Sequence, residues 1–238
     1  MNITVETHCH TIASGHAYST MKEMITAAKE KGLEAIAITE HAPDMPETCG
    51  IYYFQNYKVI PREQYGVKVL MGVELNILDE AGNIDMDDAL LARQDLVLAS
   101  VHTPCYSGRI NKDGVTESYI NTMKNPRINI IGHPDDSRFP IHYEALVKAA
   151  KETRTLLEVN NSSLSPVSFR QGGKENVMTM LKLCKQYQVP VALGSDAHIE
   201  CDVGNTSYSM PLLKACEFPE ELVANTSYQK LKSFLTKG

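Results

Sequence analysis

Several kinds of segment are missing from this sequence of 238 residues. No apolar run approaches the ~18 residues that a membrane span needs, and the N-terminus lacks the basic and apolar regions of a signal peptide. Lys and Arg are scattered singly under a net charge of −6, so no basic run indicates a nucleic-acid or anionic-membrane surface. We therefore expect a cytoplasmic protein that binds neither membranes nor nucleic acids.

The six cysteines form no Cys-x-x-Cys pair and follow no regular spacing. Such usage is typical of reduced cytosolic thiols. The sequence also lacks repeats, low-complexity stretches and shifts of composition. With 43% hydrophobic and 22% charged residues it has the composition of an ordinary globular protein, and its length is typical of one α/β domain. We therefore expect residues 1–238 to form a single domain.

Short β-rich runs alternate with stretches of helical period along the chain. The predicted strands are 3–8, 34–39, 67–74, 95–101, 127–132, 155–160 and 190–195. The predicted helices are one capped by Ser19 and three more at 142–153, 174–188 and 227–236, with a turn or small hairpin at 79–83. Near-continuous apolar strands predict a parallel sheet buried on both faces, and about seven strand–helix repeats indicate a β/α barrel. An open doubly wound sheet is the alternative, although no Gly-x-Gly-x-x-Gly follows the first strand to support a dinucleotide site.

Seven of the eight histidines follow the C-terminal end of a predicted strand, directly or within a few residues. They are His8, His10, His16, His41, His102, His133 and His198, whereas His142 begins a helix. Glu74 ends the third predicted strand and Asp196 follows the seventh. In a β/α barrel the loops after the strands share one face, where active sites are built. We therefore expect the seven histidines and two carboxylates to converge in space.

This set of side chains favours metal ions. His8 and His10 lie two residues apart on a strand, so their side chains point the same way; as neutral imidazoles they suit one shared cation. Imidazole and carboxylate together suit zinc, iron or manganese. Because an open four-coordinate site needs about three protein ligands, the set suffices for two or three ions. A single histidine is more often structural, but independent placement would not put seven of eight after strand ends.

Short motifs surround these positions: H-C-H-T (8–11), H-A-Y-S (16–19), I-T-E-H-A-P (38–43), G-V-E-L-N (72–76), H-P (133–134), E-V-N-N-S-S (158–163) and A-L-G-S-D-A-H (192–198). Together they resemble the PHP family (polymerase and histidinol phosphatase), in particular its stand-alone phosphatases of the YcdX type. The resemblance runs from residue 3 to about residue 200, and more loosely to the end of the chain.

The resemblance implies a distorted seven-stranded (β/α)7 TIM-like barrel and three divalent metal ions, zinc first, with manganese or iron as alternatives. Carried onto this chain, it assigns one ion to His8, His10, Glu74 and Asp196, a second to His16, His41 and His198, and a third to His102 and His133 with Glu74 as a bridge. It also implies a small phosphorylated substrate and is compatible with a homo-oligomer such as a trimer.

Two positions depart from the family pattern. The family usually has Asp two residues before the H-x-H, where this chain has Glu6, and it usually has T-D-H at the second strand end, where Glu40 precedes His41. Both replacements keep the charge and lengthen the side chain. If these carboxylates orient the imidazoles from outside the ligand set, their reach changes, and with it metal preference and rate.

We expect hydrolysis of small phosphomonoesters by a metal-bound hydroxide that attacks phosphorus in line. Phosphoryl transfer asks chiefly for positioning and charge stabilisation, and clustered cations supply both. Arg170 and Lys174, in the segment after the sixth predicted strand, and Arg138, after His133, are candidate contacts of the phosphate or leaving group. A solvated surface position is the alternative for each of them.

Three other functions compete with this interpretation. Amidohydrolases also place H-x-H after the first barrel strand, but many use a lysine where this chain has Glu74 as the bridging group. PHP domains also occur as nucleases beside polymerases, and no polymerase domain or basic groove accompanies this one. A catalytically inactive metal-binding regulatory module is the third alternative, and it need not retain the complete set of open-site ligands seen here.

Overall fold

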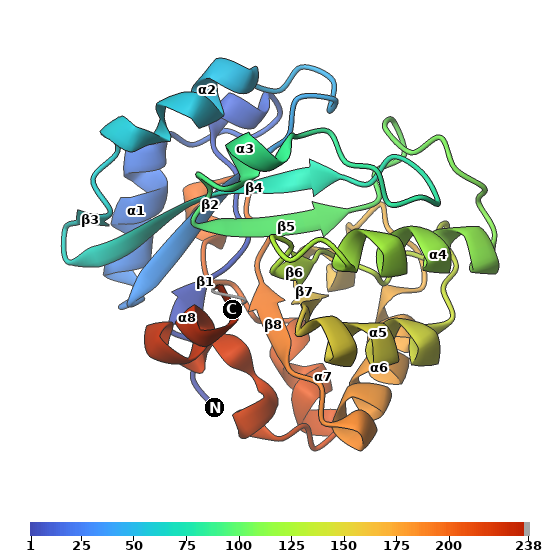
Figure 1. Cartoon of the computed structure of the whole chain (residues 1–238). Coiled ribbons are helices and arrows are strands. Elements are labelled where there is room, and N and C mark those ends of the chain that lie inside the picture. The colour runs from blue at the N-terminus through green and yellow to red at the C-terminus, as the bar shows by residue number, and fades with distance from the viewer. Residues whose placement is uncertain (236–238) are drawn as a thin grey trace.

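Parallel strands form a nearly closed barrel with helices around it in the computed structural model, which describes residues 1–235 (Figure 1). The strands are Val5–Glu6 (β1), Ala35–His41 (β2), Glu63–Gln64 (β3), Val67–Asn76 (β4), Leu96–Ser100 (β5), Ile130–Ile131 (β6), Leu156–Asn160 (β7) and Val191–Gly194 (β8). Seven of them pair in the order β1-β2-β4-β5-β6-β7-β8, all parallel, while β3 pairs antiparallel with the start of β4. The predicted distorted (β/α)7 TIM-like barrel is confirmed.

The seam between β8 and β1 is looser than the other strand pairs. Cys9 and Ala197 form an isolated parallel bridge. The amide of His10 donates to the carbonyl of Ala197 at 2.8 Å, and the amide of Asp196 donates to the carbonyl of His8 at 2.9 Å. β1 is shorter than the predicted strand 3–8, because the chain beyond Glu6 makes isolated hydrogen bonds to the segment after β8 and no continuous ladder.

The helices surround the strands. They are Met21–Glu30 (α1), Ile51–Gln55 (α2), Asp88–Leu91 (α3), Lys112–Met123 (α4), Tyr143–Thr153 (α5), Gly173–Tyr187 (α6), Ser209–Ala215 (α7) and Tyr228–Leu235 (α8). The predicted helices 142–153 and 174–188 agree with α5 and α6 to within one residue. The predicted helix 227–236 corresponds to α8, and its last residue lies outside the described residues. None of the helices within residues 1–235 has the length and apolar character that crossing a membrane requires.

The cap of α1 differs from the prediction by one residue. Thr20, not Ser19, is the N-cap, because its side chain accepts from the amide of Glu23 while the Glu23 carboxylate accepts from the amide of Thr20 at 2.7 Å. Such a reciprocal capping box satisfies two amides that the first turn leaves unpaired. Ser19 instead donates to the carboxylate of Glu200, which joins the start of α1 to the loop after β8.

The helix α4 is not among the predicted helices. Its buried face carries Val115, Tyr119 and Met123, spaced four residues apart. Gly114, Thr116 and Ser118 are buried beside them and, being small or polar, weaken the apolar period of 3.6. Ser118 and Thr116 satisfy their hydroxyls on the carbonyls four residues earlier, at 2.9 and 2.5 Å. A narrow apolar stripe, with small polar side chains packed beside it, therefore holds this helix against the barrel.

The barrel interior changes character half-way along the strands. Alternate residues near the strand starts form an apolar cluster with Leu231 of α8: Val5, Ala35, Ala37, Leu70, Leu96, Leu98, Ile130, Leu156 and Ala192. Since side chains two residues apart on a strand share a face, the same row continues to Thr39 and His41 on β2 and to Glu74 and Asn76 on β4. The interior is therefore apolar toward α8 and polar toward the carboxyl ends of the strands.

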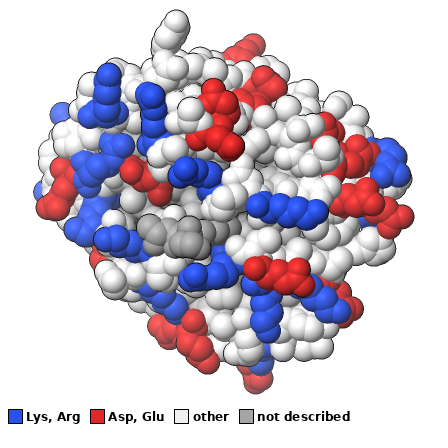
Figure 2. Space-filling view, in the orientation of Figure 1, with Lys and Arg blue, Asp and Glu red and all other residues white. Residues whose placement is uncertain are grey.

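The surface shows no comparable separation of charge on the face drawn in Figure 2. Lys and Arg side chains are interspersed with Asp and Glu there, with more basic groups on the side of α1 and β3.

Candidate metal centre

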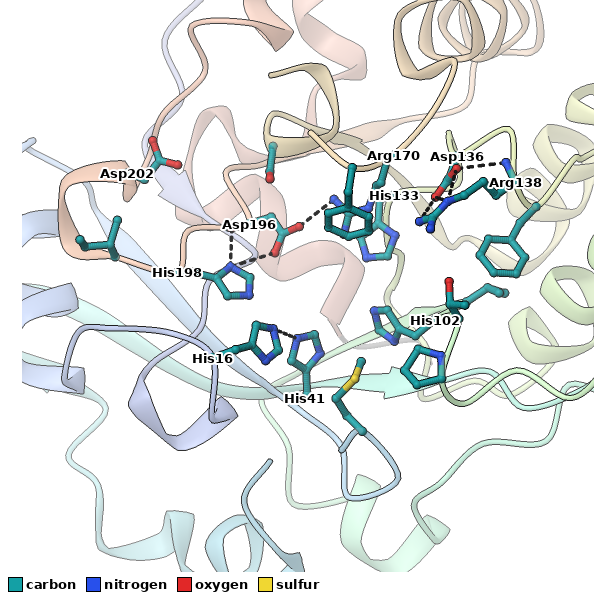
Figure 3. Close-up of a pocket in the computed structure, with 18 residues that line it drawn as sticks. His16, His41, His102, His133, Asp136, Arg138, Arg170, Asp196, His198 and Asp202 are labelled. Atoms are coloured by element: carbon teal, nitrogen blue, oxygen red, sulfur yellow. Dashed lines mark hydrogen bonds and ion pairs between the residues drawn. The ribbon is translucent and has the colours of Figure 1, made fainter. Parts of the chain in front are cut away.

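All seven predicted histidines meet at the carboxyl end of the barrel. A cavity of 610 Å³ opens there, and Figure 3 shows His16, His41, His102, His133 and His198 around it, with Asp196 among them. The ring of His10, fully buried, has its centroid 4.2 Å from that of His41 and 4.5 Å from that of His198. His8 has its ring centroid 5.1 Å from that of His10. The expected convergence of side chains from separate strands is observed.

Four of these side chains form the innermost group. His8 Nε2 and His10 Nε2 are 3.1 Å apart, so the two imidazoles point the same way as predicted. Glu74 Oε2 lies 3.4 and 3.5 Å from these two nitrogens, and Asp196 Oδ1 lies 3.6 and 3.4 Å from them. Two imidazoles and two carboxylates thus face one point in the barrel.

Glu74 occupies the centre of the whole cluster. Its Oε1 lies 2.8 Å from His133 Nε2 and 3.2 Å from His102 Nε2, whereas its Oε2 lies 2.8 Å from His41 Nδ1. The two oxygens of this carboxylate therefore face imidazoles from three different strand ends.

His16, His41 and His198 form the outermost group. His16 Nε2 lies 3.3 Å from His41 Nε2, and the ring centroids of His16 and His198 are 4.9 Å apart. Ligand atoms of His10, His41 and His198 also lie within 4.8 Å of one another. His10 therefore joins the inner group to the outer one, and the cluster is continuous.

The environment favours the neutral form of four of these imidazoles. His8 differs, because the charges of Glu158 and Glu74 outweigh its burial and raise its pKa well above the ordinary value. Burial lowers the pKa of His10, well below its ordinary value, and the neighbouring His41 and His198 lower it further. Burial also lowers the pKa values of His16 and His41, and that of His102 despite the opposing charge of Glu74. Neutral imidazole is the form that binds a cation.

The two carboxylates are held ionised. Burial alone would raise the pKa of Glu74, but the imidazoles of His8 and His102 outweigh it and hold the pKa well below its usual range. Burial likewise opposes ionisation of Asp196, and the charges of His8 and Arg170 place its pKa well below the ordinary value. Ionised carboxylates beside imidazoles make a donor set for divalent cations, and binding a cation would release the proton that these carboxylates favour on His8.

Three buried atoms of the cluster make no hydrogen bond within the described residues: His41 Nδ1, Glu74 Oε2 and His102 Nε2. Buried polar atoms are normally paired, so each such atom calls for a partner. Imidazole nitrogens and carboxylate oxygens that lie close together without hydrogen-bond geometry are suited to zinc, manganese or iron. The residues present therefore fit divalent cations.

Glu158 supports the inner group and was not predicted. Its Oε1 lies 2.8 Å from His8 Nδ1, and its Oε2 accepts from the amide of His133 at 2.7 Å. A carboxylate behind a ligating imidazole fixes its tautomer and orientation. A side-chain carbon at Gly194 would collide with Glu158 Oε1, so glycine at that position leaves room for the contact. The signal available in the sequence was an acidic residue within an otherwise apolar predicted strand.

The two departures from the family pattern act in different ways. Glu40 accepts from Ser14 Oγ at 2.6 Å, and Ser14 Oγ lies 3.2 Å from His10 Nδ1, so Glu40 acts on the imidazole through a serine. Glu6 does not reach an imidazole in these contacts. It accepts from the backbone amides of His8 at 2.9 Å, of Ser195 at 3.1 Å and of Gly204 at 2.7 Å, and thereby ties the seam of the barrel together.

The three basic candidates lie in different environments. The Arg170 side chain is 8% exposed, and its Nη1 donates to Asp196 Oδ2 at 3.0 Å, so it is not a solvated surface group. Arg138 also lines the cavity, is 33% exposed at the side chain and pairs with Asp136 at 2.6 Å. Lys174 is exposed in the first turn of α6 and is not among the described residues that line the cavity.

Asn161 and His142 belong to the structure around the site. Asn161 Oδ1 accepts from the amides of Tyr208 and Ser209 at 2.9 and 3.0 Å, which fastens the start of α7. His142 pairs with Asp113 at 2.9 Å, is half exposed and does not line the cavity, as its position at a helix start predicted.

Comparison with known proteins agrees with this geometry. A PHP domain model matches residues 6–164. A probable phosphatase of Caldicellulosiruptor saccharolyticus is 44% identical over 235 residues, which cover 99% of this chain and 97% of that protein. A probable phosphatase of Caldicellulosiruptor bescii is 45% identical over 236 residues, covering 99% and 96%. The crystal structure of histidinol phosphate phosphatase from Lactococcus lactis, complexed with zinc, L-histidinol and phosphate, superposes with a TM-score of 0.63 at 18% identity, covering 91% of this chain and 94% of that one. The predicted family is confirmed, and the chain belongs to the PHP domain family.

Proposed function

We propose that this PHP-family phosphatase hydrolyses small phosphomonoesters at three divalent cations, with zinc as the first candidate. The ligands would be His8, His10, His16, His41, Glu74, His102, His133, Asp196 and His198, and the whole chain would act as one hydrolase unit. The observation that supports this most strongly is Glu74, whose two oxygens face imidazoles from three strand ends at 2.8 to 3.2 Å. A carboxylate surrounded by imidazoles in this way is better suited to contact several ions than a single ion.

The bound cations would supply Lewis acidity and a water of lowered pKa, which is the nucleophile that ester hydrolysis needs. The residues of the chain hold and orient the groups around them. Arg170 lies beside the cluster, and the charge of Asp196, despite burial, raises its pKa, so it stays cationic. Its guanidinium has five donors, and those not directed at Asp196 would bind phosphate oxygens.

The direct experiment combines metal analysis with a phosphomonoester assay. Protein purified without chelator should hold about three ions per chain and release phosphate from a chromogenic phosphomonoester. His10→Ala and Asp196→Ala should each abolish release while circular dichroism and thermal unfolding remain those of a folded protein. His142→Ala is the matched control, because this histidine lies outside the cavity, and it should keep full activity.

Other outcomes would identify the competing functions. Hydrolysis of amides without phosphate release would indicate an amidohydrolase, and cleavage of oligonucleotides in preference to monoesters would indicate a nuclease. Full metal content without turnover over a broad panel of phosphate esters would indicate an inactive metal-binding module. Near-normal turnover by either ligand variant would contradict the proposed site.

A further inference from the structure

A small hairpin after β4 places a carboxylate close to the candidate metal centre. The chain folds back on itself there through an antiparallel bridge between Ile77 and Ile84, which closes the hairpin predicted at 79–83. The return brings Asp85 beside Asn76, the last residue of β4. The hairpin therefore contributes a side chain to the surroundings of the site, although it lies outside the ligand set.

Asp85 fixes the orientation of the Asn76 carboxamide. Asp85 Oδ1 accepts from the backbone amide of Asn76 at 2.9 Å, and Asp85 Oδ2 accepts from Asn76 Nδ2 at 2.6 Å and from the amide of Asp44 at 3.0 Å. Backbone and side-chain N–H groups donate, so both oxygens of Asp85 act as acceptors. The reverse orientation of the Asn76 carboxamide would set its oxygen against an oxygen of Asp85, and the hydrogen-bond network therefore decides the assignment.

The Asn76 carboxamide in turn decides which nitrogen of His102 carries the proton. Asn76 Oδ1 lies 2.7 Å from His102 Nδ1. A carboxamide oxygen only accepts, so His102 Nδ1 donates and bears the proton, and the neutral ring then has its lone pair on Nε2. His102 Nε2 makes no hydrogen bond within residues 1–235 and lies 3.2 Å from Glu74 Oε1. The lone pair therefore points into the cluster, where a cation would be bound (Figure 3).

Glu74 favours the opposite tautomer of His102. A carboxylate accepts from an imidazole N–H more strongly than a neutral amide oxygen does, because charge-assisted hydrogen bonds are the stronger ones. Glu74 alone would therefore draw the proton of His102 to Nε2. A proton there would block the nitrogen that faces the cluster and turn the lone pair toward Asn76. The carboxylate of Asp85 opposes this, because it holds the oxygen of Asn76 toward Nδ1.

We propose that Asp85 is a positioning residue which, through Asn76, keeps the proton of His102 on Nδ1 and leaves Nε2 free to bind a cation. A carboxylate behind a ligating imidazole commonly fixes its tautomer by direct contact, and here a carboxamide stands between the two groups. The inference rests on the proposed function only where it gives His102 a cation to bind. The position of the proton is a property of the chain itself.

The proton can be located in chelator-treated protein by long-range ¹H–¹⁵N spectra of the imidazole rings. At a pH about two units above the ordinary histidine pKa, the unmodified protein should show His102 with its proton on Nδ1, and loss of these signals in His102→Gln assigns them. Asp85→Ala should move the proton to Nε2. The affinity for zinc, titrated against a competing chelator, should fall by about tenfold in Asp85→Ala, as on loss of other groups that support a ligand.

The matched control is Asp79→Ala, the same change in the same hairpin. Asp79 Oδ1 accepts from the amide of Ala81 at 2.9 Å, and Asp79 Oδ2 accepts from Asn83 Nδ2 at 2.8 Å, so this carboxylate stabilises the turn. Asp79→Ala should loosen the hairpin while the proton of His102 stays on Nδ1 and the zinc affinity is unchanged. An equal effect of both variants would show that Asp85 acts only through the stability of the hairpin, and would overturn the proposal.

The spectra separate this inference from the proposed function. A proton on Nε2 of His102 in the unmodified protein overturns the role of Asp85, even if zinc binding and phosphate release are both found. A proton that stays on Nδ1 in Asp85→Ala overturns it as well. If the proton lies on Nδ1 and moves in Asp85→Ala, but the protein neither binds zinc nor releases phosphate, the role of Asp85 stands and the proposed function is wrong.

Discussion

The two halves of the barrel interior are built on the same strands and use opposite chemistry. Toward α8 the inward side chains are apolar and packed, and toward the carboxyl ends they are imidazoles and carboxylates, of which His8, His10 and Glu74 are fully buried. Apolar burial stabilises the fold, whereas buried charges cost free energy unless they are paired or coordinate a metal. One half of the barrel therefore maintains the structure, and the other half uses part of that stability to hold a reactive site.

Replacing the central carboxylate should give the largest effect and would test the polar half directly. Glu74→Gln keeps the shape of the side chain and removes its charge, so both the metal content and kcat/KM for a phosphomonoester should fall. The fall in kcat/KM should be about a thousandfold or more, which is the scale reached by loss of one strong transition-state interaction. The unfolding midpoint should change little in chelator-treated protein. Glu144→Gln, the same change at an exposed ion pair with Lys148, should alter neither quantity. Unchanged turnover in Glu74→Gln would contradict the assignment of activity to the polar half of the barrel interior.

A substitution in the apolar half should show the opposite pattern. Leu98 is fully buried in the cluster next to α8, and Leu98→Ala should lower the free energy of unfolding by about 4 kcal/mol through lost burial and a residual cavity. Denaturant titration measures this change. Activity per folded molecule should stay the same at low temperature, and a selective loss of kcat would show that the two halves are coupled.

The pH dependence of stability should distinguish two neighbouring carboxyls beside the site. Burial raises the pKa of Asp135 to about 7, so the stability that it contributes is present at low pH and is lost as pH rises toward 7. Asp135→Asn has no ionisable group there, so its free energy of unfolding does not fall in this way. Between pH 4 and pH 8 the variant should gain on the order of 3 kcal/mol in free energy of unfolding relative to the unmodified protein. Chelator-treated protein and denaturant titration at several pH values give the measurement.

Asp136 is the control, because its pKa shifts the other way. Burial opposes ionisation there, but the hydrogen bonds and charge of Arg138 outweigh it and lower the pKa. The stabilising contribution of this carboxylate is present above its ordinary pKa and is lost as pH falls. Asp136→Asn should therefore lose stability relative to the unmodified protein as pH rises from 3 to 5, and parallel curves for the two variants would contradict the assignment.

The smallest effect is expected from the serine between Glu40 and His10. Ser14→Ala removes the contact that orients the imidazole, and metal affinity should fall by about tenfold, the lower end of the effect of such supporting groups. Titration with a competing chelator measures this affinity. Ser233→Ala on the exposed side of α8 should have no effect, and an equal loss in both variants would show that Ser14 acts only through general stability.

Most of the fold could be predicted because its signals are local. Apolar runs such as 35–38 and 96–99 are buried on both faces of a parallel strand, and amphipathic stretches such as α5 and α6 repeat every 3.6 residues. The helix α4 was not predicted in this way, because small and polar residues such as Gly114 and Ser118 are buried beside its apolar stripe and weaken the period. The capping residue of α1 was misplaced by one position because Ser19 and Thr20 are both suitable caps, and only the Glu23 contact distinguishes them.

By itself the sequence determined that seven histidines and two acids follow strand ends, and the geometry of a parallel barrel then requires them to meet at one end. Tertiary structure alone decided which groups support them: Glu158 behind His8, Ser14 between Glu40 and His10, and Arg170 buried against Asp196. These contacts join strands and loops that are distant along the chain. Their formation depends on how far side chains reach across the barrel, and the local periodicity of a sequence carries no information about such contacts.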